Sequence, residues 1–204
     1  CWLFHEDNKG DALIFAKGGT ESILWEKNIF GPSGGGGWSN SPVRAGLGDD
    51  DYDGYSYRSQ KFVIRNNLFY GLRGESAFAF DGPKQAILYN NVFYKNENVY
   101  RSMIVINKNT GAIGGPAIDI YSLNNIFYNN GNKPIYWVRD YNSEINFKRD
   151  SNLYYLSGSG GDLDLSTEAN HVLVDPSFVN VPTSIQFDKT KGPEQIALVL
   201  EKFK

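Results

Sequence analysis

Apolar residues along the chain fall in short runs between polar residues and glycines, and one of these runs recurs with the same neighbours. Two asparagines precede an aliphatic residue and an aromatic pair in IRNNLFYG (64–71), LYNNVFYK (88–95) and SLNNIFYN (122–129), with weaker copies in WEKNIFG and RDSNLYYL. Aligning the copies on the last asparagine gives positions 28, 67, 91, 125 and 152, at intervals of 39, 24, 34 and 27 residues. Irregular intervals above a minimum in the twenties are typical of a solenoid whose loops differ in length.

Three short strands are expected in each repeat. The residues before the aligned asparagine, such as FVI (62–64), and those after it, such as LFY, have the composition of strands. Another strand is expected earlier in each repeat, in ALIFAK (12–17), YSYR (55–58), AFAFD (77–81), IVIN (104–107) and YWVR (136–139). Residues 1–180 show no helical periodicity, so the pattern predicts an all-β fold, a parallel β-helix with three strands per coil.

The repeated asparagines are interpreted as architecture. An asparagine at a tight corner tolerates the left-handed conformation and can hydrogen-bond the backbone of the next coil, so stacked corners form an asparagine ladder. The aliphatic residue and the phenylalanine that follow are expected to fill the interior together. Repeats of this kind encode a scaffold, and the chemistry is therefore sought elsewhere.

The segments FVIRNNLFYG, AILYNNVFYKN, IYSLNNIFYNNG and VLVDPSFVN (172–180) resemble those of the pectate-lyase-like, right-handed parallel β-helix proteins. The resemblance covers nearly all of residues 1–180. It implies a superfamily of polysaccharide lyases, glycoside hydrolases and surface proteins, and an extracellular or cell-surface location. Fold alone does not select among these activities.

The expected organisation is a set of coils over residues 1–181, with a Gly- and Asp-rich loop insertion at 31–54, followed by a C-terminal cap segment at 182–204. Pro193 favours a helix over a last strand in that cap. The chain opens in mid-coil at Trp2, so we expect the C-terminal portion of a longer solenoid. A preceding β-helix segment or a partner chain would then cover the first coil.

The composition of the chain limits which classes of partner are expected. The 204-residue chain has a formal net charge of −3, and no segment is apolar for long enough to cross a membrane. Neither a nucleic acid nor a membrane span is therefore expected. The single cysteine allows no internal disulfide, and the first residues lack the basic, apolar and small-residue succession typical of a signal peptide.

Strand alternation predicts which residues face outward from the earliest strand of each repeat. One outward row is expected to contain Lys17, Arg58, Asp81, Asn107 and Arg139, with Trp137 on the same face and Tyr141 nearby. Arginine and lysine bind carboxylates or sulfates, and an aromatic ring offers a flat face to a sugar, so the row predicts an acidic polysaccharide as partner. The alternative is that these cations are ordinary solvated or ion-paired surface groups.

A second candidate site is an acidic run in the loop insertion. It consists of Asp49, Asp50, Asp51 and Asp53. Several carboxylates on an irregular backbone suit Ca²⁺, although their spacing is not that of an EF-hand. A solvated acidic turn is the alternative.

Two chemistries remain open for the outward row. The resemblance implies β-elimination on a uronate, in which Arg58 or Lys17 takes the proton and a cation neutralises the carboxylate. A hydrolase would instead need two carboxyl groups about 5–9.5 Å apart, for which Asp81 with Asp53 or Asp140 is the candidate pair. The contrasting function is a non-catalytic adhesin or structural β-helix that assembles end to end with another chain.

Overall fold

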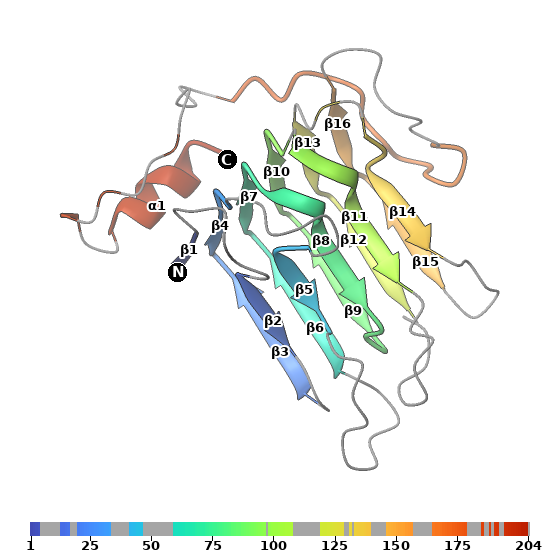
Figure 1. Cartoon of the computed structure of the whole chain (residues 1–204). Helices are drawn as coiled ribbons and strands as arrows, with labels where there is room; N and C mark the ends of the chain where they lie inside the picture. Colours follow the sequence, from blue (N-terminus) through green and yellow to red (C-terminus); the bar gives the residue numbers. More distant parts are fainter. Residues whose placement is uncertain are drawn as a thin grey trace.

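The computed structural model describes residues 1–4, 13–16, 20–33, 41–46, 59–96, 98–107, 119–128, 131, 133–139, 146–156, 165–178, 185, 188, 190–191 and 194–203. These residues form short strands in three parallel sheets and one helix (Figure 1). The predicted all-β, parallel β-helix fold is confirmed.

The three sheets run side by side along the solenoid. Sheet A contains β1 (Trp2–Leu3), β4 (Ile29–Phe30), β7 (Leu68–Tyr70), β10 (Val92–Tyr94), β13 (Ile126–Tyr128) and β16 (Leu153–Tyr155). Sheet B contains β2 (Ile14–Ala16), β5 (Val43–Ala45), β8 (Arg73–Asp81), β11 (Asn98–Asn107) and β14 (Tyr136–Arg139). Sheet C contains β3 (Thr20–Glu26), β6 (Ser59–Arg65), β9 (Ala86–Tyr89), β12 (Ile120–Leu123) and β15 (Phe147–Asp150). From β2 onward the chain passes through sheets B, C and A in turn, so neighbouring strands of a sheet are one coil apart.

An asparagine ladder joins the coils at the corner between sheets C and A. The backbone N and the Nδ2 of Asn67 both donate to Oδ1 of Asn91, each at 3.0 Å, and the same pair of bonds links Asn91 to Asn125. Asn28 and Asn152 extend the ladder in the two directions. The predicted ladder is confirmed.

The left-handed conformation belongs to the residue before each ladder asparagine. Positive φ angles between 52° and 56° occur at Lys27, Asn66, Asn90, Asn124 and Ser151. The two asparagines of each NN pair therefore have different tasks, since the first makes the turn at an exposed position and the second makes the buried hydrogen bonds of the ladder. Lysine and serine at two of the turn positions show that the turn itself tolerates other side chains.

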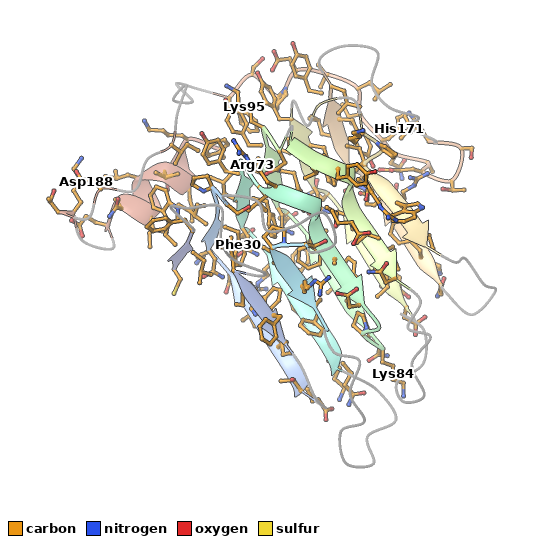
Figure 2. All side chains as sticks on the ribbon, in the orientation of Figure 1. Phe30, Arg73, Lys84, Lys95, His171 and Asp188 are labelled. Carbon is orange, nitrogen blue, oxygen red and sulfur yellow. The ribbon has the colours of Figure 1, made fainter. Side chains whose placement is uncertain are left out.

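Aromatic rings stack through the middle of the solenoid. The centroids of Phe69 and Phe93 are 4.4 Å apart with rings 9° from parallel, and the stack continues on both sides through Phe30, Phe127 and Tyr154. Figure 2 shows Phe30 among the strands and Lys84 at the periphery. Burying each ring contributes about 2 kcal/mol, so the stack is a main source of stability.

The expectation that the aliphatic residue before each phenylalanine also faces inward is wrong. Leu68 and Val92 belong to a separate apolar cluster from the one that holds Phe69 and Phe93. Successive strand residues point to opposite faces, so the aliphatic residues lie on the outer face of sheet A.

Helix α1 (Glu194–Glu201) covers part of that outer face. Ile196, Val199 and Leu200 pack against the cluster formed by Ile29, Leu68, Val92, Tyr94, Ile185 and Phe203. The chain returns from the β16 end to the β1 and β4 end, where α1 lies (Figure 1). The expected helix is present, but it lies along one side of the solenoid instead of closing its end.

A strand of sheet B lies inside the predicted loop insertion. β5 (Val43–Ala45) pairs with both β2 and β8 and so occupies the place in sheet B that the sequence pattern predicts for residues 55–58. The predicted neighbour of β2 and β8 is therefore wrong, and residues 55–58, Arg58 included, lie outside the described residues. Pro42 and Gly46 flank this short strand. Because proline and glycine are typical of loops, the sequence pattern predicts a loop here.

Candidate functional site

The outer face of sheet B carries the residues of the predicted row that the structure describes. Strand register aligns Asp81, Asn107 and Arg139 across β8, β11 and β14. A second outward row aligns two positions earlier and consists of Phe15, Arg44, Ala79, Val105 and Trp137. The inward row consists of Ile14, Val43, Phe78, Ile104 and Tyr136. The predicted alternation is therefore confirmed for the described residues, and Arg44 joins the outward face from β5.

Asp81 is held by an arginine and an amide from the neighbouring strands. Nε of Arg44 lies 3.3 Å from Oδ2 of Asp81, and Nδ2 of Asn107 donates to Oδ1. The side chains of Arg44 and Asp81 are 13% and 10% exposed. Because both carboxylate oxygens are engaged, Asp81 orients Arg44 and compensates its charge.

A second arginine is anchored in the same way. Nε of Arg101 lies 3.3 Å from Oε1 of Glu75, and the guanidinium carbon is 4.7 Å from the centroid of the Trp137 ring. The Arg101 side chain is 39% exposed, whereas the Glu75 side chain is 6% exposed. A buried carboxylate and an aromatic face thus hold a guanidinium at the surface, where contact with the ring also stabilises it.

The terminal nitrogens of both arginines are not the atoms that make these two ion pairs. Each ion pair uses Nε, and a guanidinium has four further N–H donors on its two Nη atoms. Among the described residues, neither Arg44 nor Arg101 has another hydrogen-bond or ion-pair partner. The outer face of sheet B therefore holds donors suited to a planar anion such as a carboxylate, and these donors are more accessible at Arg101 than at the largely covered Arg44.

Several predicted site residues lie outside the described residues. They are Lys17, Asp49, Asp50, Asp51, Asp53, Arg58, Asp140 and Tyr141. For Arg139 the structure gives the backbone position beside Asn107. In the part of the chain that is described, no three His, Cys, Asp or Glu side chains gather to hold a metal. The Ca²⁺ site therefore stays a prediction.

Sequence reasoning missed Arg44, Glu75 and Arg101. Arg44 alternates with Val43 and Ala45, which is the signal of a short strand, but the glycines around it favoured a loop. Glu75 lies in the first half of β8 and Arg101 in the first half of β11. Neither position belongs to a repeated motif. Their pairing depends on the stacking of coils, which the linear pattern does not give.

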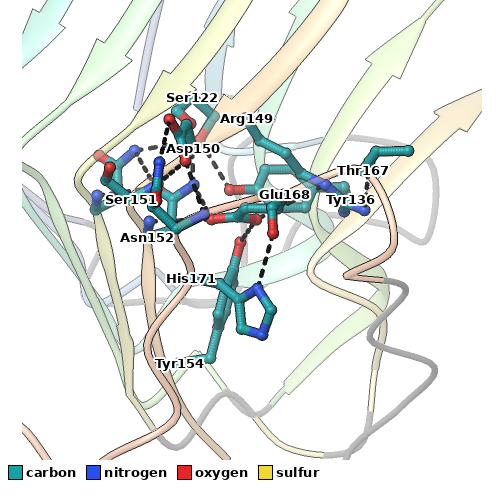
Figure 3. A network of polar contacts seen from close by, with 12 residues as sticks. Ser122, Tyr136, Arg149, Asp150, Ser151, Asn152, Tyr154, Thr167, Glu168 and His171 are labelled. Carbon is teal, nitrogen blue, oxygen red and sulfur yellow. Dashed lines mark hydrogen bonds and ion pairs between the residues drawn. The ribbon is translucent and has the colours of Figure 1, made fainter.

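A second polar cluster is buried at the last coil (Figure 3). Oε1 of Glu168 accepts hydrogen bonds from the backbone N and Nδ2 of Asn152, at 3.0 and 2.9 Å, and so takes the place of the next ladder asparagine. Oε2 accepts from the Tyr154 hydroxyl at 2.7 Å, and Nε of Arg149 lies 3.7 Å away. The Glu168 side chain is fully buried, so the cluster ends the ladder and is closed to a substrate.

Burial also acts on the tyrosines of this cluster. Desolvation raises the pKa of Tyr154 and of Tyr136 far above the ordinary tyrosine value. The Tyr136 hydroxyl lies 2.8 Å from Oγ of Ser122, and the Arg149 guanidinium carbon is 5.4 Å from the Tyr136 ring centroid. Both phenols stay neutral in the folded protein and act as packed hydrogen-bonding groups.

Comparison with known proteins found no family model, no curated protein and no solved structure that matches the chain. Within the described residues, no helix has the length and apolar character needed to span a membrane. The functional argument therefore depends on the geometry of the outer face of sheet B.

Proposed function

We propose that the outer face of sheet B binds an extracellular acidic polysaccharide. The observation that carries the proposal is the pair of arginines, Arg44 and Arg101, each anchored through Nε to a buried carboxylate of sheet B. This arrangement leaves the Nη donors for a uronate or sulfate group, and bidentate contacts of this kind are strong and directional. Trp137 and the half-exposed Tyr100 add aromatic surface beside Arg101.

Cleavage of the bound polymer belongs to the same proposal. A lyase would use Lys17 or Arg58 as the base, whereas a hydrolase would use Asp81 with a second carboxyl group from Asp53 or Asp140. In the described contacts Asp81 is fully engaged, which favours a role in orienting Arg44 over a role as the acid. Lyase chemistry is therefore the first reaction to test.

The test combines binding with product analysis. Polygalacturonate, alginate, chondroitin sulfate and neutral xylan are incubated with the protein, with and without Ca²⁺, and both unsaturated products and reducing ends are followed. Unsaturated products identify a lyase, and reducing ends alone identify a hydrolase. Binding without products reduces the proposal to a carbohydrate-binding face, and no binding to any of the polymers contradicts it.

Matched variants test the face itself. Arg44→Gln and Arg101→Gln should each weaken binding by about tenfold or more, because each removes a charged donor. Arg65→Gln is the control, since Arg65 also pairs through Nε with a glutamate but lies on sheet C. Equal losses in all three variants would show a general charge effect and contradict a specific site.

End-to-end assembly is the second candidate function. β2 and β3 each have one strand neighbour among the described residues, and they carry Phe15 and Leu24, which are 49% and 53% exposed. Unpaired edges with exposed apolar side chains favour association of coils. Light scattering should then show oligomers that Phe15→Lys and Leu24→Lys reduce, and a monomer at all concentrations would exclude this function.

A further inference from the structure

A cleft of about 620 Å³ lies between α1 and the corner that joins sheets C and A. It is separate from the outer face of sheet B. The solenoid contributes Lys27, Asn66, Asn67, Leu68, Asn90 and Val92 to its lining, and the C-terminal segment contributes Ile196, Ala197, Leu200, Glu201 and Phe203. The volume is within the range of small-molecule sites.

The inner part of the cleft is apolar. Leu68, Val92 and Phe203 lie beneath it and are buried in the cluster on the outer face of sheet A, whereas Ile196 and Leu200 of α1 are half-buried at its wall. Ala197 is exposed and small, so the wall is open beside it. An aliphatic chain placed here would leave water for an apolar surface, which is favourable for each methylene buried.

The solenoid rim of the cleft is polar and carries one cation. Lys27, Asn66 and Asn90 are turn residues of successive coils, so their side chains form a row at steps of about 4.8 Å. Lys27 is exposed, and its ammonium makes no ion pair or hydrogen bond with the described residues. It does contribute to lowering the pKa of Glu26, but the hydrogen bond from Arg65 is the main cause.

Glu201 limits the ligand to a single anionic group. It lines the cleft at the end of α1, where the helix dipole is also negative. A second anionic group at that end would be repelled, whereas one at Lys27 would be attracted. The charges across the cleft thus orient an anionic ligand, with its head at Lys27 and away from Glu201.

We infer that this cleft binds a monoanionic amphiphile, such as a medium-chain carboxylate, with its head at Lys27 and its chain between α1 and sheet A. Contact of the ligand's chain with the apolar residues supplies most of the affinity. Lys27 and the amides of Asn66 and Asn90 favour an anionic head group. This inference does not depend on the polysaccharide proposal.

Calorimetric titration with laurate below its micelle concentration tests the site. Affinity should fall by about fourfold for each methylene removed in the C12, C10 and C8 series. In the Glu201→Gln variant, which has no carboxylate at the other end of the cleft, dodecylamine should bind more weakly than laurate because Lys27 repels it. Amide shifts in the NMR spectrum should concentrate at residues 66–68 and 196–200, and equal binding of amine and carboxylate to that variant would overturn the inference.

Variants separate the site from non-specific uptake. Ala197→Trp fills the cleft from an exposed position and should abolish binding, while Lys27→Met should weaken laurate by about threefold to fivefold and leave dodecanol unchanged. Lys148→Met, an exposed lysine on sheet C, is the matched control and should have no effect. Glu201→Gln should strengthen laurate slightly.

The folded state is checked by circular dichroism for each variant. Unchanged laurate affinity in folded Ala197→Trp would overturn the inference. So would a stable dimer that Ala197→Trp dissociates and laurate does not, because the cleft would then be a protein contact.

Discussion

Asn91 belongs to the asparagine ladder and Asn107 to the outer face of sheet B. Both regions run along the solenoid, but the two asparagines have different roles. Asn91 is fully buried and its amide bonds to Asn67, Asn125 and backbone carbonyls. Asn107 lies on the outer face of sheet B, where its amide nitrogen bonds to Asp81 and its buried Oδ1 has no donor among the described residues. The ladder uses the same residue in each coil to join the coils. The outward residues of sheet B differ from coil to coil, so this face can offer a specific set of groups to a ligand.

The largest expected effect comes from breaking the ladder. Asn91→Ala removes bonds to several buried groups and should lower the free energy of unfolding by about 3–5 kcal/mol, because each unsatisfied group costs about 1–3 kcal/mol. Asn107→Ala should cost about 1 kcal/mol or less. Urea unfolding followed by circular dichroism measures both, and losses within about 1 kcal/mol of each other would remove the distinction between the two regions.

The end of the ladder should be nearly as sensitive. Glu168→Ala leaves the backbone N and Nδ2 of Asn152 without an acceptor and should destabilise the protein by about 2–4 kcal/mol. Glu168→Gln keeps an acceptor oxygen and should lose less. Hydrogen exchange at residues 152–155 measures the local opening, and equal exchange in the two variants would show that the acceptor is unimportant.

The third-largest effect on stability is expected from alkaline pH, which should destabilise the coil that contains Tyr136 and Tyr154. Tyr136 and Tyr154 have raised pKa values in the folded protein, so their contribution is complete below the unfolded value near 10 and is lost as pH rises above it. Each tyrosine should then cost about 1.4 kcal/mol per pH unit. The double variant Tyr136→Phe/Tyr154→Phe should show a shallower fall of unfolding free energy between pH 10 and 11.5, with Tyr100→Phe, at a half-exposed position, as control. Parallel slopes for all three proteins would contradict the assignment.

The smallest effect on stability is expected on sheet B. Arg101→Gln should lower the unfolding free energy by less than about 1 kcal/mol, because the Arg101 side chain is 39% exposed and the glutamine amide can still donate to the buried Glu75. Its effect on polysaccharide affinity should be far larger, as measured by calorimetry. A stability loss above about 2 kcal/mol would mean that Arg101 belongs to the scaffold as the ladder does.

The regions differ in how well sequence predicts them. Asn67, Asn91 and Asn125 recur with the same neighbours because stacked corners require identical chemistry in each coil, so the ladder and the strands beside it were predictable. Arg44 and Glu75 recur nowhere, and their partners lie on other coils. The docking of α1 was not predictable from the repeat alone, since it depends on aliphatic residues that the repeat suggests lie inside the solenoid and that strand alternation puts outside.

The direction of the ladder gives Glu168 a further role. Every ladder amide donates toward the β16 end and accepts from the β1 end, so the side-chain dipoles align along the solenoid with their positive ends toward Glu168. A carboxylate at the positive end of such a row is attracted by the whole row, as an anion is at the start of a helix. It also cannot donate onward, so Glu168 both completes the line of dipoles and prevents its continuation.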